Sequence, residues 1–196
     1  MKLLNKRNLK FIILFSFFTL SYLNLSAQRI NGGFLGGLST NQIDGDTQKD
    51  YKKLGLFSGV FVETNFTEVI GAKVELYYIG KGALKNVDGV EIFKTHLNYV
   101  EMPFLLRITP INDIELDIGL AFSYLISARM FEYAEEVPTS NINMHHFDFS
   151  GIVSGSYYFI ENVAFNVRID YSIVPVKNNP NWYNSNMSFG LIYRFN

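Results

Sequence analysis

The segment from Ile114 to Ile126 alternates between two kinds of residue, and this pattern constrains the fold more than any other feature. Its even positions are all large and apolar, whereas the odd positions are mostly charged or small and include Glu115 and Asp117. Successive side chains of a β-strand point to opposite faces, so the segment predicts a strand with one apolar and one polar face. The pattern recurs along most of the chain, which indicates an all-β protein.

Residues 1–27 have the order of a secretory signal peptide. An apolar run from Phe11 to Leu25 follows a basic start, and Ser26-Ala27-Gln28 supplies small residues for cleavage after Ala27. The alternative is a single transmembrane anchor, but the run is short for a span of about 20 residues and contains several polar residues. We therefore expect an exported protein with a signal peptide at 1–27 and one domain at 28–196.

Charge and cysteine content exclude several classes of function. Residues 1–27 hold four of the 17 basic residues and none of the 18 acidic ones, so the remainder has a net charge of −5. This charge argues against nucleic-acid binding. The chain has no cysteine, which excludes disulfides, thiol catalysis and cysteine-ligated metals.

Eight segments show the two-residue period of strands, and their connections alternate between short and long. The predicted strands are 29–39, 53–65, 69–80, 95–108, 114–127, 146–159, 163–176 and 186–195. Residues 66–68, 109–113 and 160–162 form short turns, whereas 40–52, 81–94, 128–145 and 177–185 form longer, more polar loops. Short periplasmic turns and long extracellular loops are typical of outer-membrane barrels, so we predict an eight-stranded antiparallel up-and-down transmembrane β-barrel.

Alternation alone does not say which face points inward, because a soluble lipocalin-like barrel would bury the apolar face. An eight-stranded barrel has an interior only just wide enough for side chains, and about five large apolar residues per strand would overfill it. The polar faces contain many Gly, Ala and Ser residues that fit inside. We therefore expect the apolar faces to contact lipid.

Aromatic residues gather near both proposed membrane boundaries, as in the girdles of outer-membrane barrels. We expect Phe66, Tyr157, Phe159, Phe165, Tyr193 and Phe195 on the periplasmic side, and Tyr77, Tyr78, Phe131, Phe147, Trp182 and Tyr183 toward the outside.

Several short motifs, in their order and spacing, resemble those of the PorT-like outer membrane beta-barrel family. They are Gly37–Asp46 followed by Tyr51–Gly55 and Gly59, Glu75–Tyr78 with Lys81-Gly82, Leu97–Pro103, Arg168–Tyr171 and the ending Gly190–Phe195. The resemblance implies a small outer-membrane barrel of the Bacteroidetes type, often labelled a porin family, that reaches the membrane through the barrel assembly machinery. One namesake is associated with protein secretion, a role that the fold alone does not transfer.

The predicted lumen is rich in charge, which leaves two interpretations open. The inward charges are expected to be Glu63, Lys73, Glu75, Glu101, Arg107, Glu115, Asp117, Asp148, Arg168, Asp170 and Arg194. They form either a narrow polar channel or a network that pairs internally, and the small diameter favours the network. Glu101 with Arg107 or Arg168 is the expected centre of this network.

The chain offers weak candidates for catalysis and metal binding. His145, His146, Asp148 and Ser150 form the only His-Asp-Ser cluster, but neighbouring residues of one strand point to opposite faces. Asp44-Gly45-Asp46 with Asp50 lacks the ligand spacing of a calcium loop, and two adjacent histidines are too few for zinc. We expect no catalytic residues, no metal and no cofactor.

The outer loops are the expected place of any specific function. Phe131, Tyr133, Trp182 and Tyr183 are candidate contacts to a protein or glycan partner, with an aromatic girdle as the alternative. We predict a structural or interaction barrel in contact with outer-membrane lipid, accessory to secretion or envelope assembly. A narrow pore is the second possibility and a lipid-modifying enzyme the third.

Overall fold

The structure is a computed structural model that describes residues 30–45, 53–87, 90–133, 135–138, 144–178 and 181–195. The predicted signal peptide at 1–27 lies outside the described residues. Within these ranges, no helix is long and apolar enough to cross a membrane.

Eight antiparallel strands close into a barrel, as the sequence predicts. Strand β4 pairs with both β3 and β5, while β1 pairs with β9, so the sheet has no open edge along the barrel. The wall consists of β1 (Ile30–Asp44), β2 (Lys53–Asn65), β3 (Ile70–Val87), β4 (Val90–Ile111), β5 (Ile114–Glu132), β7 (Phe147–Ile160), β8 (Val163–Ser172) and β9 (Tyr183–Arg194). A two-residue strand, β6 (Glu135–Glu136), pairs with the end of β5.

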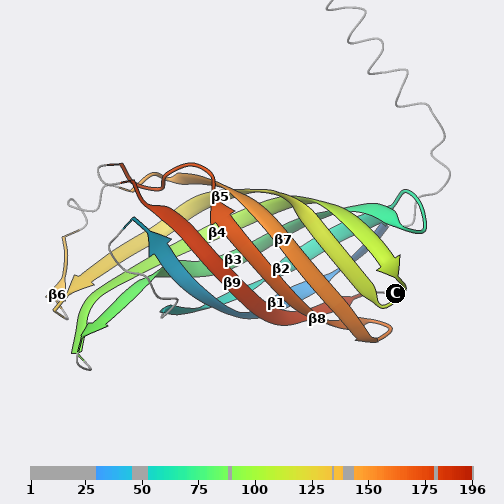
Figure 1. Ribbon diagram of the computed structural model, residues 1–196, viewed down its shortest axis with the longest axis horizontal. Helices are drawn as coiled ribbons and strands as arrows, with labels where there is room; N and C mark the ends of the chain where they lie inside the picture. The colour runs from blue at the N-terminus through green and yellow to red at the C-terminus, as the bar shows by residue number, and fades with distance from the viewer. Residues whose placement is uncertain are drawn as a thin grey trace, which may run out of the picture.

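The two ends of the barrel differ in shape. Figure 1 shows the strands tilted across the long axis, with the β3–β4 hairpin and β6 extending at one end and the C-terminus at the other. The C-terminal end carries the short turns at 66–69, 112–113 and 161–162. Short turns mark the periplasmic end of outer-membrane barrels, so the extended end is the outer one.

The strands are longer toward the outside than predicted. Pairing of β3 with β4 continues to Val87 and Val90, so most of the predicted loop 81–94 is a hairpin. Strands β1, β5 and β9 likewise extend into the predicted loops 40–52, 128–145 and 177–185. In contrast, β8 ends at Ser172, four residues earlier than predicted. Apolar alternation marks only the lipid-facing part of a strand, because backbone pairing outside the membrane needs no apolar face.

The prediction that apolar faces point outward and polar faces point into the lumen is confirmed in the centre of the barrel. On β5, Leu116, Ile118 and Leu120 are exposed on the outer surface, while Glu115 and Asp117 are buried inside. This arrangement rules out a lipocalin-like inversion. Beyond Leu125 the register between β4 and β5 shifts by one residue, so that Met130 instead of an odd-numbered residue points inward.

The aromatic girdle is confirmed at the periplasmic end and only partly at the outer end. All six residues expected on the periplasmic side are exposed. At the outer end Tyr78 and Phe147 are exposed, but Tyr77 and Trp182 are buried at 2% and 7% exposure. Tyr77 belongs to the inward face of β3, and Trp182 lies in a segment that folds back over the mouth of the barrel.

A charge placed on the outer face should test its contact with lipid. Leu120 lies midway along the apolar face of β5, and we expect Leu120→Arg to lower the free energy of unfolding by about 2–4 kcal/mol. Urea titration of the protein folded in lipid vesicles measures this change. The control Asn112→Arg, in the exposed turn between β4 and β5, should cost less than about 0.5 kcal/mol. An equal response of the two variants would contradict the assignment.

Candidate functional site

The lumen contains three layers of charged side chains. The inner layer, nearest the periplasmic end, consists of Glu63, Arg107, Glu115 and Arg194. Arg107 donates a short hydrogen bond to Glu63, and Arg194 Nη2 lies 2.5 Å from Glu115 Oε1. Arg194 Nε also lies 2.6 Å from Glu63 Oε1, an ion-pair contact without hydrogen-bond geometry. Two carboxylates and two guanidinium groups balance in this layer.

The middle layer consists of Lys73, Asp117, Glu75 and Arg168, all nearly inaccessible to solvent. Arg168 donates to both oxygens of Glu75, at 2.7 and 3.1 Å, and Lys73 Nζ donates to Asp117 Oδ2 at 2.9 Å. This layer also contains two negative and two positive groups. Bidentate pairing of this kind offsets much of the cost of removing the charges from water.

The outer layer consists of Lys81, Glu101, Asp170 and Asp148. Lys81 Nζ lies 2.7 Å from Glu101 Oε2 and 3.1 Å from Asp170 Oδ1. Tyr77 and Ser123 also donate to Glu101, while Asn186 donates to Asp170. Among the described residues, the hydrogen-bond partners of Asp148 are both neutral, Ser172 and Asn184.

Inward aromatic rings fill the space between the layers. Arg168 lies over the rings of Phe57 and Tyr77, with its guanidinium carbon 5.7 and 5.2 Å from their centroids. A glycine on β9 makes room for one of these rings, since a Cβ at Gly190 would lie 2.7 Å from the Phe57 ring. The packing leaves the charged layers enclosed by side chains.

Every charge predicted to face the lumen does so, but the predicted pairing is wrong. Glu101 pairs with Lys81, and neither Arg107 nor Arg168 contacts it. Glu101 and Arg107 are six residues apart on β4 and thus about 20 Å apart along the strand. Lys81 was missed because it was assigned to a loop, although it continues the inward two-residue period of Lys73 and Glu75.

Apolar side chains cover the lumen at its outer end. The segment after β8 turns inward, since Val176 N donates to Trp182 O and Trp182 N donates to Lys177 O. Lys177 Nζ lies 4.1 Å from the centroid of the Trp182 ring. We call this group the apolar cap; its members, which are all buried and lie in the outer parts of β1, β4 and β5 and in this segment, are Ile43, Leu97, Met130, Val176 and Trp182.

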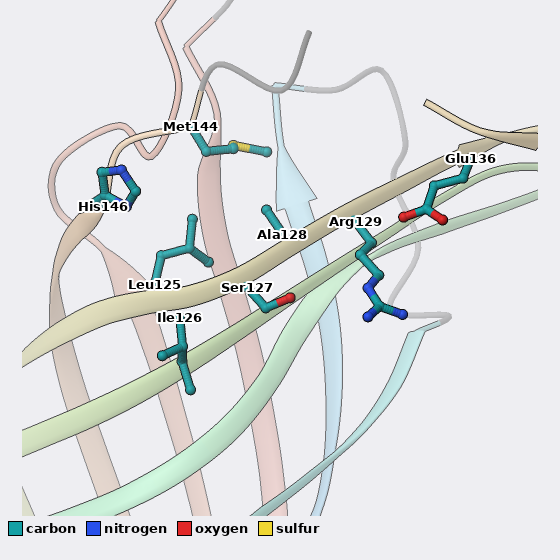
Figure 2. Close-up of a pocket in the computed structure, with 8 residues that line it drawn as sticks. All are labelled: Leu125, Ile126, Ser127, Ala128, Arg129, Glu136, Met144 and His146. Carbon is teal, nitrogen blue, oxygen red and sulfur yellow. The ribbon is translucent and has the colours of Figure 1, made fainter. Parts of the chain in front are cut away.

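A pocket of about 740 Å³ lies on the outer part of the barrel wall. Pairing between β5 and β7 ends at Tyr124 and Phe147, and the pocket occupies the gap that β5 leaves as it continues to β6. Figure 2 shows Arg129 and Glu136 toward one end of the pocket, with Met144 and His146 toward the other. Leu125, Ile126, Ser127 and Ala128 complete the lining.

The loop residues predicted to contact a partner have different surroundings. Tyr133 is strongly exposed and has a positive φ of 49°, whereas Phe131 packs edge-on against His96. Tyr183 stacks on Tyr171, and Trp182 belongs to the apolar cap. The expectation that Trp182 is a surface contact is wrong, because its segment folds inward.

The candidate catalytic and calcium residues do not converge. His146 is exposed and stacks on Tyr124, while Asp148 and Ser150 point into the lumen. His145 is also exposed, where its ring contacts Pro175 O. Asp44 accepts a hydrogen bond from Gln42, and Asp46 and Asp50 lie outside the described residues. In the described part of the chain, no three Asp, Glu, His or Cys residues form a group suited to a metal ion.

Removing one member of a buried pair tests the middle layer. Glu75→Gln leaves Arg168 without its countercharge, and we expect a loss of about 3–5 kcal/mol in the free energy of unfolding. The double variant Glu75→Leu with Arg168→Met removes both charges and should recover most of that loss. Glu161→Gln in an exposed turn is the control for the chemical change, and urea titration in vesicles provides the measurement. A Glu75→Gln barrel as stable as this control would argue against a dry, paired layer.

Solved structures of small outer-membrane proteins share this fold. Neisserial surface protein A has a TM-score of 0.57 and 11% identity, and the match covers 84% of this chain and 97% of that one. The attachment invasion locus protein Ail of Yersinia pestis has a TM-score of 0.54 and 12% identity, covering 84% of this chain and 98% of that one. None of the curated proteins matches the chain. A family model described as the outer membrane protein beta-barrel domain matches residues 21–178, so the chain belongs to this family of outer-membrane barrels.

Proposed function

We propose that this protein is a closed, non-conducting barrel that acts through its outer face as a structural or interaction component of the outer membrane. The observation that carries the proposal is the filled lumen. Paired charges occupy the inner and middle layers, and the apolar cap covers the outer layer. A water-filled path would have to displace several buried ion pairs, each of which is costly to break.

The narrow-pore alternative has less support. A conducting pore needs continuous water through the barrel, and eight strands leave an interior that side chains fill. Here the inward rings of Phe57 and Tyr77 add to that filling beside Arg168. The family label "porin" is therefore a weak guide to activity for this chain.

The role at the outer membrane is proposed from the sequence motifs and the outer face. The resemblance to PorT-like barrels supports a role accessory to secretion or envelope assembly, and the order of residues 1–27 supports export through a cleaved signal peptide. The outward apolar residues support contact with membrane lipid, and the last strand would be presented to the barrel assembly machinery. We propose no catalytic role, because His146 lies apart from Asp148 and Ser150.

The outer pocket is the proposed place of contact with a protein or glycan partner. It combines an arginine, a glutamate and a histidine with apolar walls from Leu125 and Met144. Mixed polar and apolar linings of this kind suit specific recognition. Exposed Tyr133 stands next to the β5 end that lines the pocket and extends the surface available for contact.

Planar-bilayer recording tests whether the barrel is closed. We expect the folded protein to give no reproducible conductance steps, because paired charges and aromatic rings fill the narrow lumen. An open porin reconstituted in the same bilayers is the positive control. Reproducible single-channel steps from heat-modifiable, folded protein would contradict the proposal and favour the narrow pore.

Site-specific photo-crosslinking in cells tests the outer pocket. A photoreactive amino acid in place of Arg129 should give a discrete covalent adduct, and the same probe in place of Glu161 in the periplasmic turn should not give it. Arg129 and Glu161 are both exposed, so exposure alone does not separate them. A deletion of 178–184 is a poorer test, since it removes buried Trp182 and Asn184. The same adducts at both positions, or none at Arg129, would remove the pocket as the contact site.

A further inference from the structure

Among the three layers formed by the described residues, the charges balance in the inner and middle layers but not in the outer layer. The inner and middle layers each contain two acidic and two basic groups, whereas Lys81 faces Glu101, Asp170 and Asp148. Lys81 makes its ion pairs with Glu101 and Asp170, and Asp148 lies beyond ion-pair distance. Two carboxylates therefore share one ammonium group, and the third has no cationic partner among the described residues.

Asp148 is buried at 2% exposure and has an unused carboxylate oxygen. Its Oδ2 accepts hydrogen bonds of 2.9 Å from the Ser172 hydroxyl and from the Asn184 amide. Its Oδ1 has no hydrogen-bond partner in the part of the chain that the structure describes. Neutral donors stabilise a carboxylate, but they do not cancel the cost of burying its full charge.

Two further buried oxygens near Asp148 also lack partners. The Ser150 hydroxyl, in a fully buried residue, makes no hydrogen bond, and neither does Asn184 Oδ1. Ser150 stands two residues along β7 on the same inward face and is paired across strands with Ser172, which donates to Asp148. The Asn184 amide nitrogen donates a hydrogen bond to Asp148. Oxygen atoms without hydrogen-bond partners, on residues next to a carboxylate without a countercharge, are the kind of ligands that hard cations prefer.

We propose that the outer layer binds a monovalent cation, Na⁺ or K⁺, at Asp148 Oδ1, with Ser150 Oγ and Asn184 Oδ1 as the neighbouring oxygen ligands. A single positive charge matches the single carboxylate without an ion pair and reduces the excess negative charge of the outer layer, since Glu101 and Asp170 already share Lys81. A divalent ion fits less well, because it takes many oxygen ligands and usually several carboxylates, whereas Asp148 is the one carboxylate among the three proposed ligands. A bridging water would satisfy the oxygens but would leave the buried charge in place.

Cation-dependent stability tests this site in the full-length folded protein. We compare thermal unfolding in lipid nanodiscs in NaCl, KCl and N-methyl-D-glucamine chloride at equal ionic strength. At a concentration about tenfold above its dissociation constant, the bound alkali cation should raise the midpoint by about 3–6 °C relative to N-methyl-D-glucamine. Asp148→Asn keeps the shape of the side chain and removes its charge, and it should abolish this difference.

The control Asp113→Asn makes the same chemical change in an exposed turn, and it should leave the cation response intact. If Asp148→Asn does not fold, the ²³Na relaxation of the wild-type protein decides the question. We expect enhanced relaxation that K⁺ reverses. A wild-type barrel indifferent to the alkali cation in both measurements would overturn the proposal. An undiminished response in Asp148→Asn would overturn it as well.

Discussion

The narrow interior of an eight-stranded barrel is the constraint on which the rest of this structure depends. Such a lumen has room for side chains but little water. Charged side chains inside it are therefore stabilised by partners within the protein. The bidentate contact of Arg168 with Glu75 and the contact of Lys73 with Asp117 meet that demand. Because lipid surrounds the wall, these pairs are shielded from solvent on every side.

The same constraint explains why inward positions alternate between very large and very small residues. Arg168 lies against the Phe57 and Tyr77 rings, and Gly190 leaves the space that the Phe57 ring occupies. A side chain at Gly59 would collide with the backbone of β3 and with the Cβ of Tyr77. The lumen therefore reaches close packing through pairs of unlike size, which accounts for the small residues found on the polar faces of strands whose other face is uniformly large.

The two-residue period of the sequence correctly predicted which side chains face the lumen. It did not predict which side chains contact one another, because those contacts depend on positions around the barrel. It placed Glu115 and Asp117 inside and Leu116 and Ile118 outside, because a strand leaves no third choice. It did not predict that Glu101 pairs with Lys81, since partners across a lumen depend on tilt and register as well as on facing.

Trp182 shows a second limit of prediction from sequence. Its neighbours are polar residues and prolines, which favour an exposed loop, yet backbone hydrogen bonds to Val176 and Lys177 turn its ring inward. Burial of a large apolar side chain in the space above the outer layer lowers the free energy of the folded protein. The sequence pattern around Trp182 does not indicate that this space exists.

The outer wall combines an exposed strand edge with a feature that limits pairing at that edge. Where β7 ends, β5 continues without it and would present free backbone groups to other chains. Strand β6 covers the tip of this edge and places two exposed glutamates, Glu135 and Glu136, beside it. Charged side chains at an edge oppose the addition of another strand. If this end binds a partner, as proposed above, the contact would rely on side chains of the pocket more than on backbone pairing, because the glutamates of β6 oppose the addition of a strand.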